Sequence, residues 1–348
     1  MRLPSASNIV IRTPNWVGDA VMSTPFIRAA RKNFPHAKIT LLAKPWVSPV
    51  YEENPYIDRI LIYDASGRHG GARGKVRLAG ELRRERFDMA LLLQNAFEAA
   101  LITWMAGIPC RVGFDTDARR MLLTHPVHRC KSFKKLHQIG YYLEILSGAG
   151  LATDGVTPEL FFTESERRQA KEVVRDNGCP EGACVIGVNP GAAFGTAKRW
   201  FVERYADVCV RLKSVRPVFF LVFGSPAETA LGEMICEAVG NGCLNLCGRT
   251  SLRQAMSLIG CCDLFMTNDS GLMHVAAAQD IPQIAVFGST NHTTTYPESR
   301  FSHIVRSPVP CSPCMKPDCP SDHRCMDAVS VDRVLNLAIT LLDSGKRP

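Results

Sequence analysis

Long hydrophobic runs are missing from this chain of 348 residues. Its most apolar stretches, residues 99–108 and 218–223, are much shorter than the roughly 18 residues that cross a bilayer. The first seven residues also lack the apolar stretch of a secretory signal peptide. We therefore expect a soluble or peripheral protein that stays in the cytoplasm.

Two nucleotide-binding signatures are missing as well. No Gly-x-Gly-x-x-Gly follows the first predicted strand, residues 8–11, and no Gly-Lys-Ser/Thr P-loop occurs anywhere in the chain. Both motifs surround phosphates with backbone N–H groups. Their absence disfavours dinucleotide oxidoreductases and P-loop NTPases. Internal repeats and low-complexity tracts are also missing.

Charge is unevenly divided between the two halves of the chain. Residues 1–160 contain 22 Lys and Arg against 14 Asp and Glu, whereas residues 161–348 contain 19 of each sign. A local positive field indicates an anionic partner, which is a nucleic acid, a phospholipid or a phosphorylated saccharide. No nucleic-acid-binding motif accompanies the charge, so we do not expect a nucleic-acid partner.

Fourteen cysteines are scattered through the chain, and buried thiols of a cytosolic protein explain most of them. Four are exceptions because they fall within 15 positions, namely Cys311, Cys314, Cys319 and Cys325. The first two have metal-ligand spacing, so a structural zinc is one interpretation. A reduced cluster that stabilises a loop, or a disulfide, is the simpler one. No catalytic role or cofactor is expected here.

Short runs rich in Val, Ile, Leu and Phe alternate with segments of helical period, which is typical of βα units on parallel sheets. The predicted strands of the first half are residues 8–11, 39–42, 60–63 and 89–93, and those of the second are 185–188, 218–223, 264–266 and 284–287. The predicted helices are residues 19–34, 74–86, 96–106, 165–177 and 331–342. The pattern predicts an α/β protein with two doubly wound, Rossmann-like domains.

The domain boundary is expected within residues 157–166, where the breaker cluster Gly155-Val156-Thr157-Pro158 precedes a polar helix. We therefore predict a first domain of residues 1–162 and a second of residues 163–327. We expect residues 328–348 to form a C-terminal helix, and packing of this helix on the first domain is one interpretation.

A carboxylate stands where the first predicted strand turns into a helix, in Asn15-Trp16-Val17-Gly18-Asp19. Open α/β sheets bind ligands at this carboxyl edge, and Gly18 allows close approach of the backbone. Asp19 is thus placed to accept a proton from a substrate hydroxyl. An equally simple interpretation is that Asp19 is only a first-turn helix residue, stabilised by the helix dipole. The same dipole would weaken the carboxylate as a base.

The second half contains a turn suited to phosphate, Asp269-Ser270-Gly271, between a predicted strand and a helix. Amides at a helix N-terminus attract anions, and His274 lies one turn after Ser270 on the same face. A capped helix with a satisfied histidine is the alternative. Two other strand ends strengthen the interpretation as a phosphate site. One supplies Lys198 for a phosphate, and the other supplies Glu228 for ribose hydroxyls.

At these residues the chain resembles the ADP-heptose lipopolysaccharide heptosyltransferases, particularly the type that adds the second heptose. The similar segments are residues 15–19, 94–97, 106–109, 195–200 and 267–277. The resemblance implies a GT-B fold with a cleft between two domains, and an inverting transferase without a metal cofactor. It implies transfer of L-glycero-D-manno-heptose from ADP-heptose to heptosyl-Kdo2-lipid A at the cytoplasmic face of the inner membrane.

The resemblance also implies roles for residues. Asp19 becomes the catalytic base. The donor residues are Lys198, Glu228, Asp269, Ser270, Gly271 and His274, with Glu228 on the ribose. The candidates for binding the phosphorylated or Kdo-bearing acceptor are Asn15, Asn95, Arg119 and Arg120, together with Arg73, Lys75 and Arg77 on the basic half. Solvated surface charge is the alternative interpretation for most of the basic candidates.

Other functions stay open at this point. The enzymatic alternatives are heptosyltransferase I, another nucleotide-sugar GT-B enzyme and a nucleotide-sugar epimerase of similar fold. A nucleotide-sugar sensor is the non-enzymatic alternative, although a sensor has no need of a base such as Asp19.

Overall fold

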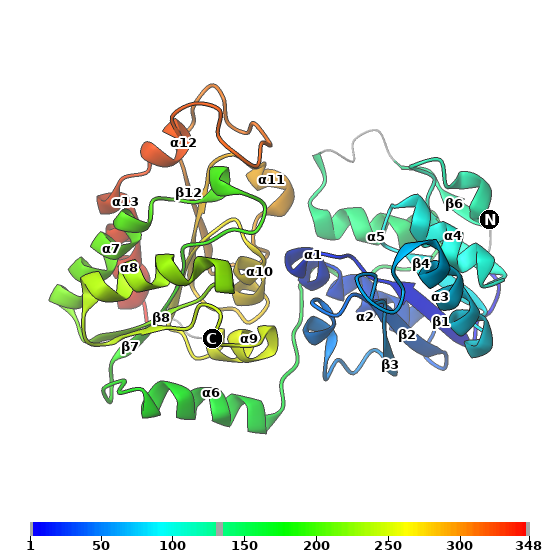
Figure 1. Ribbon diagram of the computed structural model, residues 1–348, viewed down its shortest axis with the longest axis horizontal. Coiled ribbons are helices and arrows are strands. Elements are labelled where there is room, and N and C mark those ends of the chain that lie inside the picture. The colour runs from blue at the N-terminus through cyan, green and yellow to red at the C-terminus, as the bar shows by residue number, and fades with distance from the viewer. Residues whose placement is uncertain (1–2, 130–134, 346–348) are drawn as a thin grey trace. The chain divides into compact units, whose positions relative to one another are not determined.

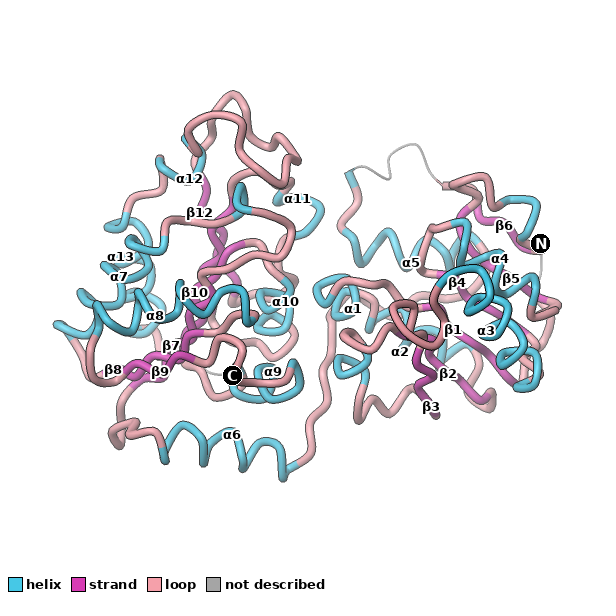
Figure 2. The backbone as a smooth tube through the Cα atoms, in the orientation of Figure 1, coloured by secondary structure: helices cyan, strands magenta, loops and turns pink. Residues whose placement is uncertain are grey.

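The computed structural model describes residues 3–129 and 135–345, which form two compact units divided between Phe161 and Phe162. The expected boundary lies one residue further along the chain. Each unit contains one parallel six-stranded sheet with helices on its faces (Figures 1 and 2). This architecture confirms the predicted α/β class.

The first unit has strand order β3-β2-β1-β4-β5-β6, and all its strand pairs are parallel. Its strands are β1 (Asn8–Arg12), β2 (Lys38–Ala43), β3 (Arg59–Ile62), β4 (Met89–Leu92), β5 (Cys110–Phe114) and β6 (His125–Val127). Its helices are α1 (Val17–Met22), α2 (Thr24–Asn33), α3 (Gly71–Glu85), α4 (Phe97–Met105) and α5 (Gln138–Gly148), with short 3-10 turns η1 (Ser48–Tyr51) and η2 (Arg120–Leu122).

Helices α3 and α4 pack against each other and share a hydrophobic core with one face of this sheet. Leu78 and Leu82 of α3 meet Val10, Leu42 and Leu92 of the strands there. Burial of each such side chain contributes about 1.5–3 kcal/mol. The strand ends, which carry the polar side chains of interest, are therefore attached to a rigid layer.

One predicted helix is two helices in the structure. Residues 19–34 were expected to be continuous, but α1 ends at Met22 and α2 begins at Thr24. Pro25 has no N–H to donate to the preceding turn, so the series of helical backbone hydrogen bonds is interrupted there. The Ser23 hydroxyl donates to the Ala20 carbonyl oxygen at 2.8 Å and closes the first helix.

The second unit has strand order β12-β11-β10-β7-β8-β9, again entirely parallel. Its strands are β7 (Cys184–Asn189), β8 (Val218–Val222), β9 (Cys243–Asn245), β10 (Leu264–Asn268), β11 (Gln283–Phe287) and β12 (Ser302–Arg306). Its helices are α6 (Glu164–Asp176), α7 (Val202–Val215), α8 (Thr229–Val239), α9 (Leu252–Ile259), α10 (Gly271–Ala277), α11 (His292–Thr295), α12 (Arg324–Asp327) and α13 (Val331–Asp343), with 3-10 turns η4 (Thr196–Lys198) and η5 (Pro226–Glu228).

The C-terminal helix α13 belongs to the second unit. It packs on α7, β10 and β11, and its Val334, Leu335 and Ala338 join the core around Ile186. The apolar face of α13 is therefore buried against its own unit, and packing of this helix on the first domain stays a prediction.

In both units the chain order reverses between two central strands, β1 and β4 in the first and β7 and β10 in the second. Ligands of open α/β sheets bind beyond the carboxyl ends of the strands at such a switch point. Asp19, Asn95, Lys198 and Asp269 each follow one of these four strands in the chain.

Candidate active site

Asp19 lies in the first turn of α1, directly after the loop that leaves β1. Its side chain is partly exposed, and the Tyr142 hydroxyl from α5 donates to its Oδ1 at 3.0 Å. Burial and the nearby Asp19 carboxylate raise the pKa of Tyr142 well above its ordinary value, so Tyr142 stays a neutral donor. This contact orients the carboxylate. No sequence pattern pointed to Tyr142.

Asn95 follows β4 and is held from two sides. Arg119 donates to its Oδ1 at 2.9 Å, and its own amide donates to the Tyr141 hydroxyl. Arg119 is fully buried and also donates to the backbone oxygens of Phe114 and Gln94. Burial lowers the pKa of Arg119 to about 10.

These contacts change the expected role of Arg119. It was a candidate for direct contact with the acceptor, but its enclosed guanidinium positions Asn95 instead. Arg120 is exposed and lies 3.5 Å from the Asp115 carboxylate, so it remains available to a ligand.

In the second unit, Lys198 and Asp269 form an ion pair. The Lys198 Nζ atom lies 2.7 Å from Asp269 Oδ2, and the Thr290 hydroxyl donates to the same oxygen at 2.6 Å. Lys198 ends η4, Asp269 follows β10 and Thr290 follows β11, so three separate loops meet here. The sequence did not point to Thr290, although its position just beyond a strand was a usable signal.

Ser270 is the N-cap of α10, and its hydroxyl oxygen accepts from the Met273 N–H at 3.3 Å. The same hydroxyl donates to Asn189 Oδ1 at 2.8 Å, which joins the ends of β7 and β10. Gly271 begins the helix, where backbone N–H groups have no partner within the helix. His274 is buried one turn later. The Ser270 cap is what the capped-helix interpretation predicts, and phosphate binding by this turn stays a prediction.

Glu228 is buried at the end of η5, where its Oε2 accepts from the backbone N–H and the hydroxyl of Ser225 at 2.7 and 2.8 Å. Its Oε1 lies 3.6 Å from the Arg199 guanidinium. A Cβ atom at Gly191 would lie 1.9 Å from that Oε1, so only glycine fits beside the carboxylate. One carboxylate oxygen is thus fixed by the turn, and the other faces the loop after β7.

The loop with the four cysteines contacts the donor loops through backbone groups. Ala197 donates to the Pro317 carbonyl oxygen at 2.9 Å, and Met315 donates to that of Ser289 at 2.8 Å. The Thr196 hydroxyl donates to Asp318 Oδ1 at 2.8 Å. The loop therefore supports the turns that carry Lys198 and Thr290.

The four thiols of this loop, Cys311, Cys314, Cys319 and Cys325, are all free, which corrects the disulfide interpretation. Within residues 3–129 and 135–345, no three His, Cys, Asp or Glu side chains are grouped as a metal ion requires. The described part of the chain therefore presents no preformed ligand set for the zinc interpretation.

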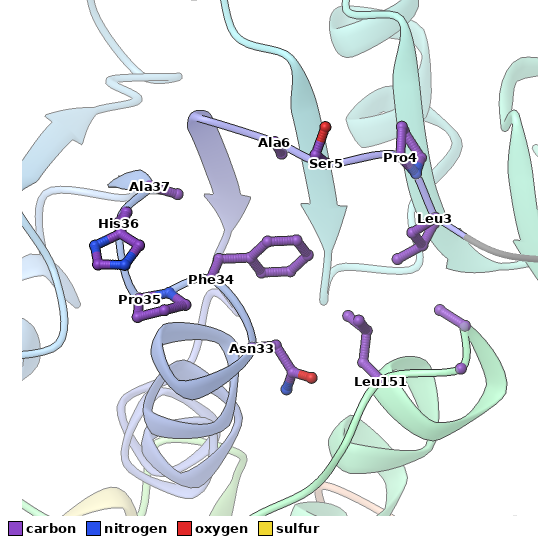
Figure 3. Close-up of a pocket in the computed structure, with 12 residues that line it drawn as sticks. Leu3, Pro4, Ser5, Ala6, Asn33, Phe34, Pro35, His36, Ala37 and Leu151 are labelled. Atoms are coloured by element: carbon purple, nitrogen blue, oxygen red, sulfur yellow. The ribbon is translucent and has the colours of Figure 1, made fainter.

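A cavity of about 440 Å³ lies at the other end of the first sheet. Residues 3–6, 33–37 and 149–151 line it, and Figure 3 shows the Phe34 ring pointing into it. The first two segments precede β1 and β2, so the cavity is at the amino ends of these strands and separate from Asp19.

Two consecutive parallel α/β units with polar loops at their switch points are the architecture of the GT-B class of glycosyltransferases. The family model of glycosyltransferase family 9 (heptosyltransferase) matches residues 75–324. The chain belongs to this family.

Individual relatives agree with this assignment. Lipopolysaccharide heptosyltransferase 2 of Salmonella typhimurium is 32% identical over 310 residues, which cover 86% of this chain and 87% of the relative. The structure of the E. coli ADP-heptose lipopolysaccharide heptosyltransferase II has a TM-score of 0.82 at 28% identity, over 98% of this chain and all of the other. A family 9 glycosyltransferase from Veillonella parvula has a TM-score of 0.88 at 26% identity, over 99% of both chains.

Proposed function

We propose that this heptosyltransferase moves L-glycero-D-manno-heptose from ADP-heptose to heptosyl-Kdo2-lipid A, and so adds the second heptose of the lipopolysaccharide inner core. The observation that carries this proposal is the 32% identity to lipopolysaccharide heptosyltransferase 2 over 86% of the chain. Identity to lipopolysaccharide heptosyltransferase 3 of Escherichia coli is lower, at 25% over 79% of the chain.

Asp19 is the general base of the proposed reaction. It removes the proton of the acceptor hydroxyl while the hydroxyl oxygen attacks the anomeric carbon of the heptose. Because the bond to ADP breaks in the same displacement, the configuration inverts. The Tyr142 hydroxyl, 3.0 Å from Asp19 Oδ1, supports this role because it orients the carboxylate.

Lys198 stabilises the departing ADP. Its ammonium is held by Asp269, which is held in turn by Thr290, so the charge is in place before the diphosphate develops its extra negative charge. The first-turn amides of α10 donate to the same diphosphate, and the Glu228 carboxylate accepts from the ribose hydroxyls. A resident metal ion has no part in this mechanism.

A peripheral contact with the cytoplasmic face of the inner membrane is part of the proposal, because the acceptor is a lipid. In the described residues, no helix is long and apolar enough to span a membrane. Helices α3 and α4 and the turn η2 support a surface contact, since they expose large apolar side chains and cations. The apolar ones are Val76, Phe97, Trp104 and Met121, and the cations include Arg73, Arg77 and Arg84.

The test is incubation with ADP-heptose and either Kdo2-lipid A or heptosyl-Kdo2-lipid A, followed by mass spectrometry. The proposal expects a mass increase of one heptose on the heptosylated acceptor alone. Transfer to Kdo2-lipid A would instead assign heptosyltransferase I activity. ADP binding without transfer to either acceptor would favour a sensor.

A further inference from the structure

Three neighbouring strands of the first unit end in a cluster of cations and aromatic rings. Arg12 is the last residue of β1, Lys44 follows β2 and Tyr63 follows β3. These strands are adjacent and parallel, so their carboxyl ends lie next to one another. The Lys44 ammonium lies 3.7 Å and the Arg12 guanidinium 5.2 Å from the centre of the Tyr63 ring.

Lys44 is a buried cation that lacks a hydrogen-bond acceptor. Its side chain is only 6% exposed. Within the described parts of the chain, its ammonium contacts the faces of Tyr63 and Trp46 and has neither an ion pair nor a hydrogen bond. The Nζ atom still reaches solvent, so its three N–H donors can bind a ligand from outside the protein. Burial and the nearby Arg12 lower the pKa of Lys44, and the more distant Glu98 and Asp64 carboxylates oppose this shift only in part.

Arg12 adds a second buried charge at 4% exposure. Its guanidinium donates to the backbone oxygens of Thr13 and Leu42 and to Asn15 Oδ1, at 2.7, 3.2 and 2.8 Å. None of these acceptors is charged. Burial lowers the pKa of Arg12 to about 10.

The carboxylate beside these cations is already engaged. Glu98 at the start of α4 lies 2.7 Å from the Lys75 Nζ atom and accepts from the Tyr63 hydroxyl. The cluster thus combines the three cations Arg12, Lys44 and Lys75 with the carboxylates of Glu98 and, near Lys44, Asp64. It reaches solvent at Lys75 and Glu98, whose side chains are about one third exposed. The arrangement has an excess of positive charge at an accessible edge.

The cluster is connected to the loop that leads to Asp19. Asn15 accepts from Arg12 through its side chain, and its backbone oxygen accepts from the Trp46 indole N–H at 2.7 Å. Asp19 follows four residues later, at the carboxyl end of the same strand. A group bound by Lys44 would therefore belong to the molecule that presents its hydroxyl to Asp19.

We propose that Lys44, with Arg12 behind it and Lys75 at its rim, binds an anionic group of the saccharide acceptor, either a phosphate or a sugar carboxylate. Such an anion supplies the acceptor oxygens that the Lys44 ammonium lacks. This inference rests on the proposed function, because it takes the first unit as the acceptor domain. It makes Lys44 and Arg12 acceptor-binding residues and gives the basic first half a defined binding site.

The test compares the parent enzyme with Lys44→Met, which keeps the length of the side chain and removes the charge. The acceptor KM should rise at least about tenfold, the scale of one charged hydrogen bond, while kcat at saturating acceptor and the KM for ADP-heptose stay within about twofold. Lys44→Arg should restore most of the acceptor affinity. Lys38→Met is the matched control, because Lys38 is exposed at the opposite end of the same strand.

Two modified acceptors identify the anion. If removal of the phosphates abolishes the difference between parent and Lys44→Met, the ligand is a phosphate. If reduction of the Kdo carboxyl groups abolishes it, the ligand is a carboxylate. An unchanged KM of Lys44→Met for the intact acceptor overturns the proposal.

Direct binding separates this inference from the proposed function. Calorimetry of the deacylated acceptor with the parent and with Lys44→Met requires no transfer of heptose, and circular dichroism verifies that both are folded. Weaker binding to Lys44→Met supports the anion site even if the parent shows no transferase activity. Lys44→Gln is measured in the same way if the methionine variant does not fold, and equal binding by the folded variant and the parent overturns the proposal.

Discussion

The ammonium of Lys198 and the hydroxyl of Thr290 converge on one oxygen of Asp269, at 2.7 and 2.6 Å. Asp269 is only 6% exposed, so this carboxylate serves as an anchor and not as a free ligand. A cation that is fixed before the reaction stabilises the leaving diphosphate without reorganisation. The predictions for the donor side follow from this arrangement.

Lys198→Ala should weaken the use of the donor and slow the chemical step together, because the cation acts on both the ground state and the developing charge. Steady-state kinetics with varied ADP-heptose should show a higher KM and a lower kcat. Thr290→Val should have a smaller effect in the same direction, since the ion pair remains. A change confined to acceptor kinetics would remove Lys198 from the donor site.

Asp19→Asn should reduce turnover by at least about a hundredfold, the usual scale of general-base catalysis. The asparagine keeps the shape of the side chain, so ADP affinity measured by calorimetry should stay nearly unchanged. Tyr142→Phe should cause a smaller loss, because it removes only the hydroxyl that orients the carboxylate. Equal turnover of Asp19→Asn and the parent would contradict the assigned role.

Gly195→Ala should impair the donor site although no side chain of that site is removed. Gly195 has φ of 148°, and a Cβ atom there would lie 2.2 Å from the Pro317 carbonyl oxygen. The cysteine loop must then move away from η4 and disturb Lys198, which should appear as a higher KM for ADP-heptose. Gly80→Ala is the control, because nothing lies within 4 Å of that Cβ position in α3, and it should stabilise the helix by about 0.5–1 kcal/mol.

The sequence predicted the alternation of strands and helices, but it did not reveal several short elements. Strands β6 and β9 have only three residues each, too few to show a period. The helix break at Ser23 was also missed, although Pro25 was visible. Local pattern therefore predicted the long buried elements and not the short ones at the sheet edges.

The candidate site was predictable to the extent that it depends on loops after strands. Asp19, Lys198 and Asp269 all lie in such loops. The residues that hold them were not predictable, since Tyr142 is 123 positions from Asp19 and Asp269 is 71 positions from Lys198. Burial of Arg119 and Lys44 was equally invisible, because a charged residue in a sequence is normally taken to be solvated.

Stability should depend on an ion pair at the start of the second unit. Arg253 donates to both carboxylate oxygens of Glu166, at 2.6 and 3.0 Å, and these contacts lower the pKa of Glu166 to about 2. A lowered carboxyl pKa contributes stability above the unfolded value of about 4.5, and the contribution is lost as the pH falls toward about 2. Glu166→Gln should therefore reduce the free energy of unfolding by about 1–3 kcal/mol at pH 7.

Urea unfolding of parent and Glu166→Gln at pH 7 and at pH 3 measures this effect. The difference in free energy of unfolding between the two proteins should shrink at the lower pH, because protonation of Glu166 weakens the ion pair of the parent. Arg168, on the same helix, forms a more exposed pair with Glu172 at 3.8 Å, so Glu172→Gln is the control and should change stability by less than about 1 kcal/mol. A difference that is independent of pH would contradict the assigned pKa.

Heptose transfer should survive brief treatment with EDTA. Lys198 and the first-turn amides of α10 can neutralise the leaving diphosphate, whereas a divalent cation requires oxygen ligands from carboxylates. The carboxylate nearest to the diphosphate turn, Asp269, is already occupied by Lys198 and Thr290.

The cysteine loop complicates the assay, because its backbone supports η4 and any damage to it would also lower activity. A Cys311→Ser, Cys314→Ser double variant is therefore assayed in parallel, with folding followed by circular dichroism. If the EDTA-treated enzyme stays folded, loses activity and regains it with magnesium alone, the metal-independent mechanism is wrong.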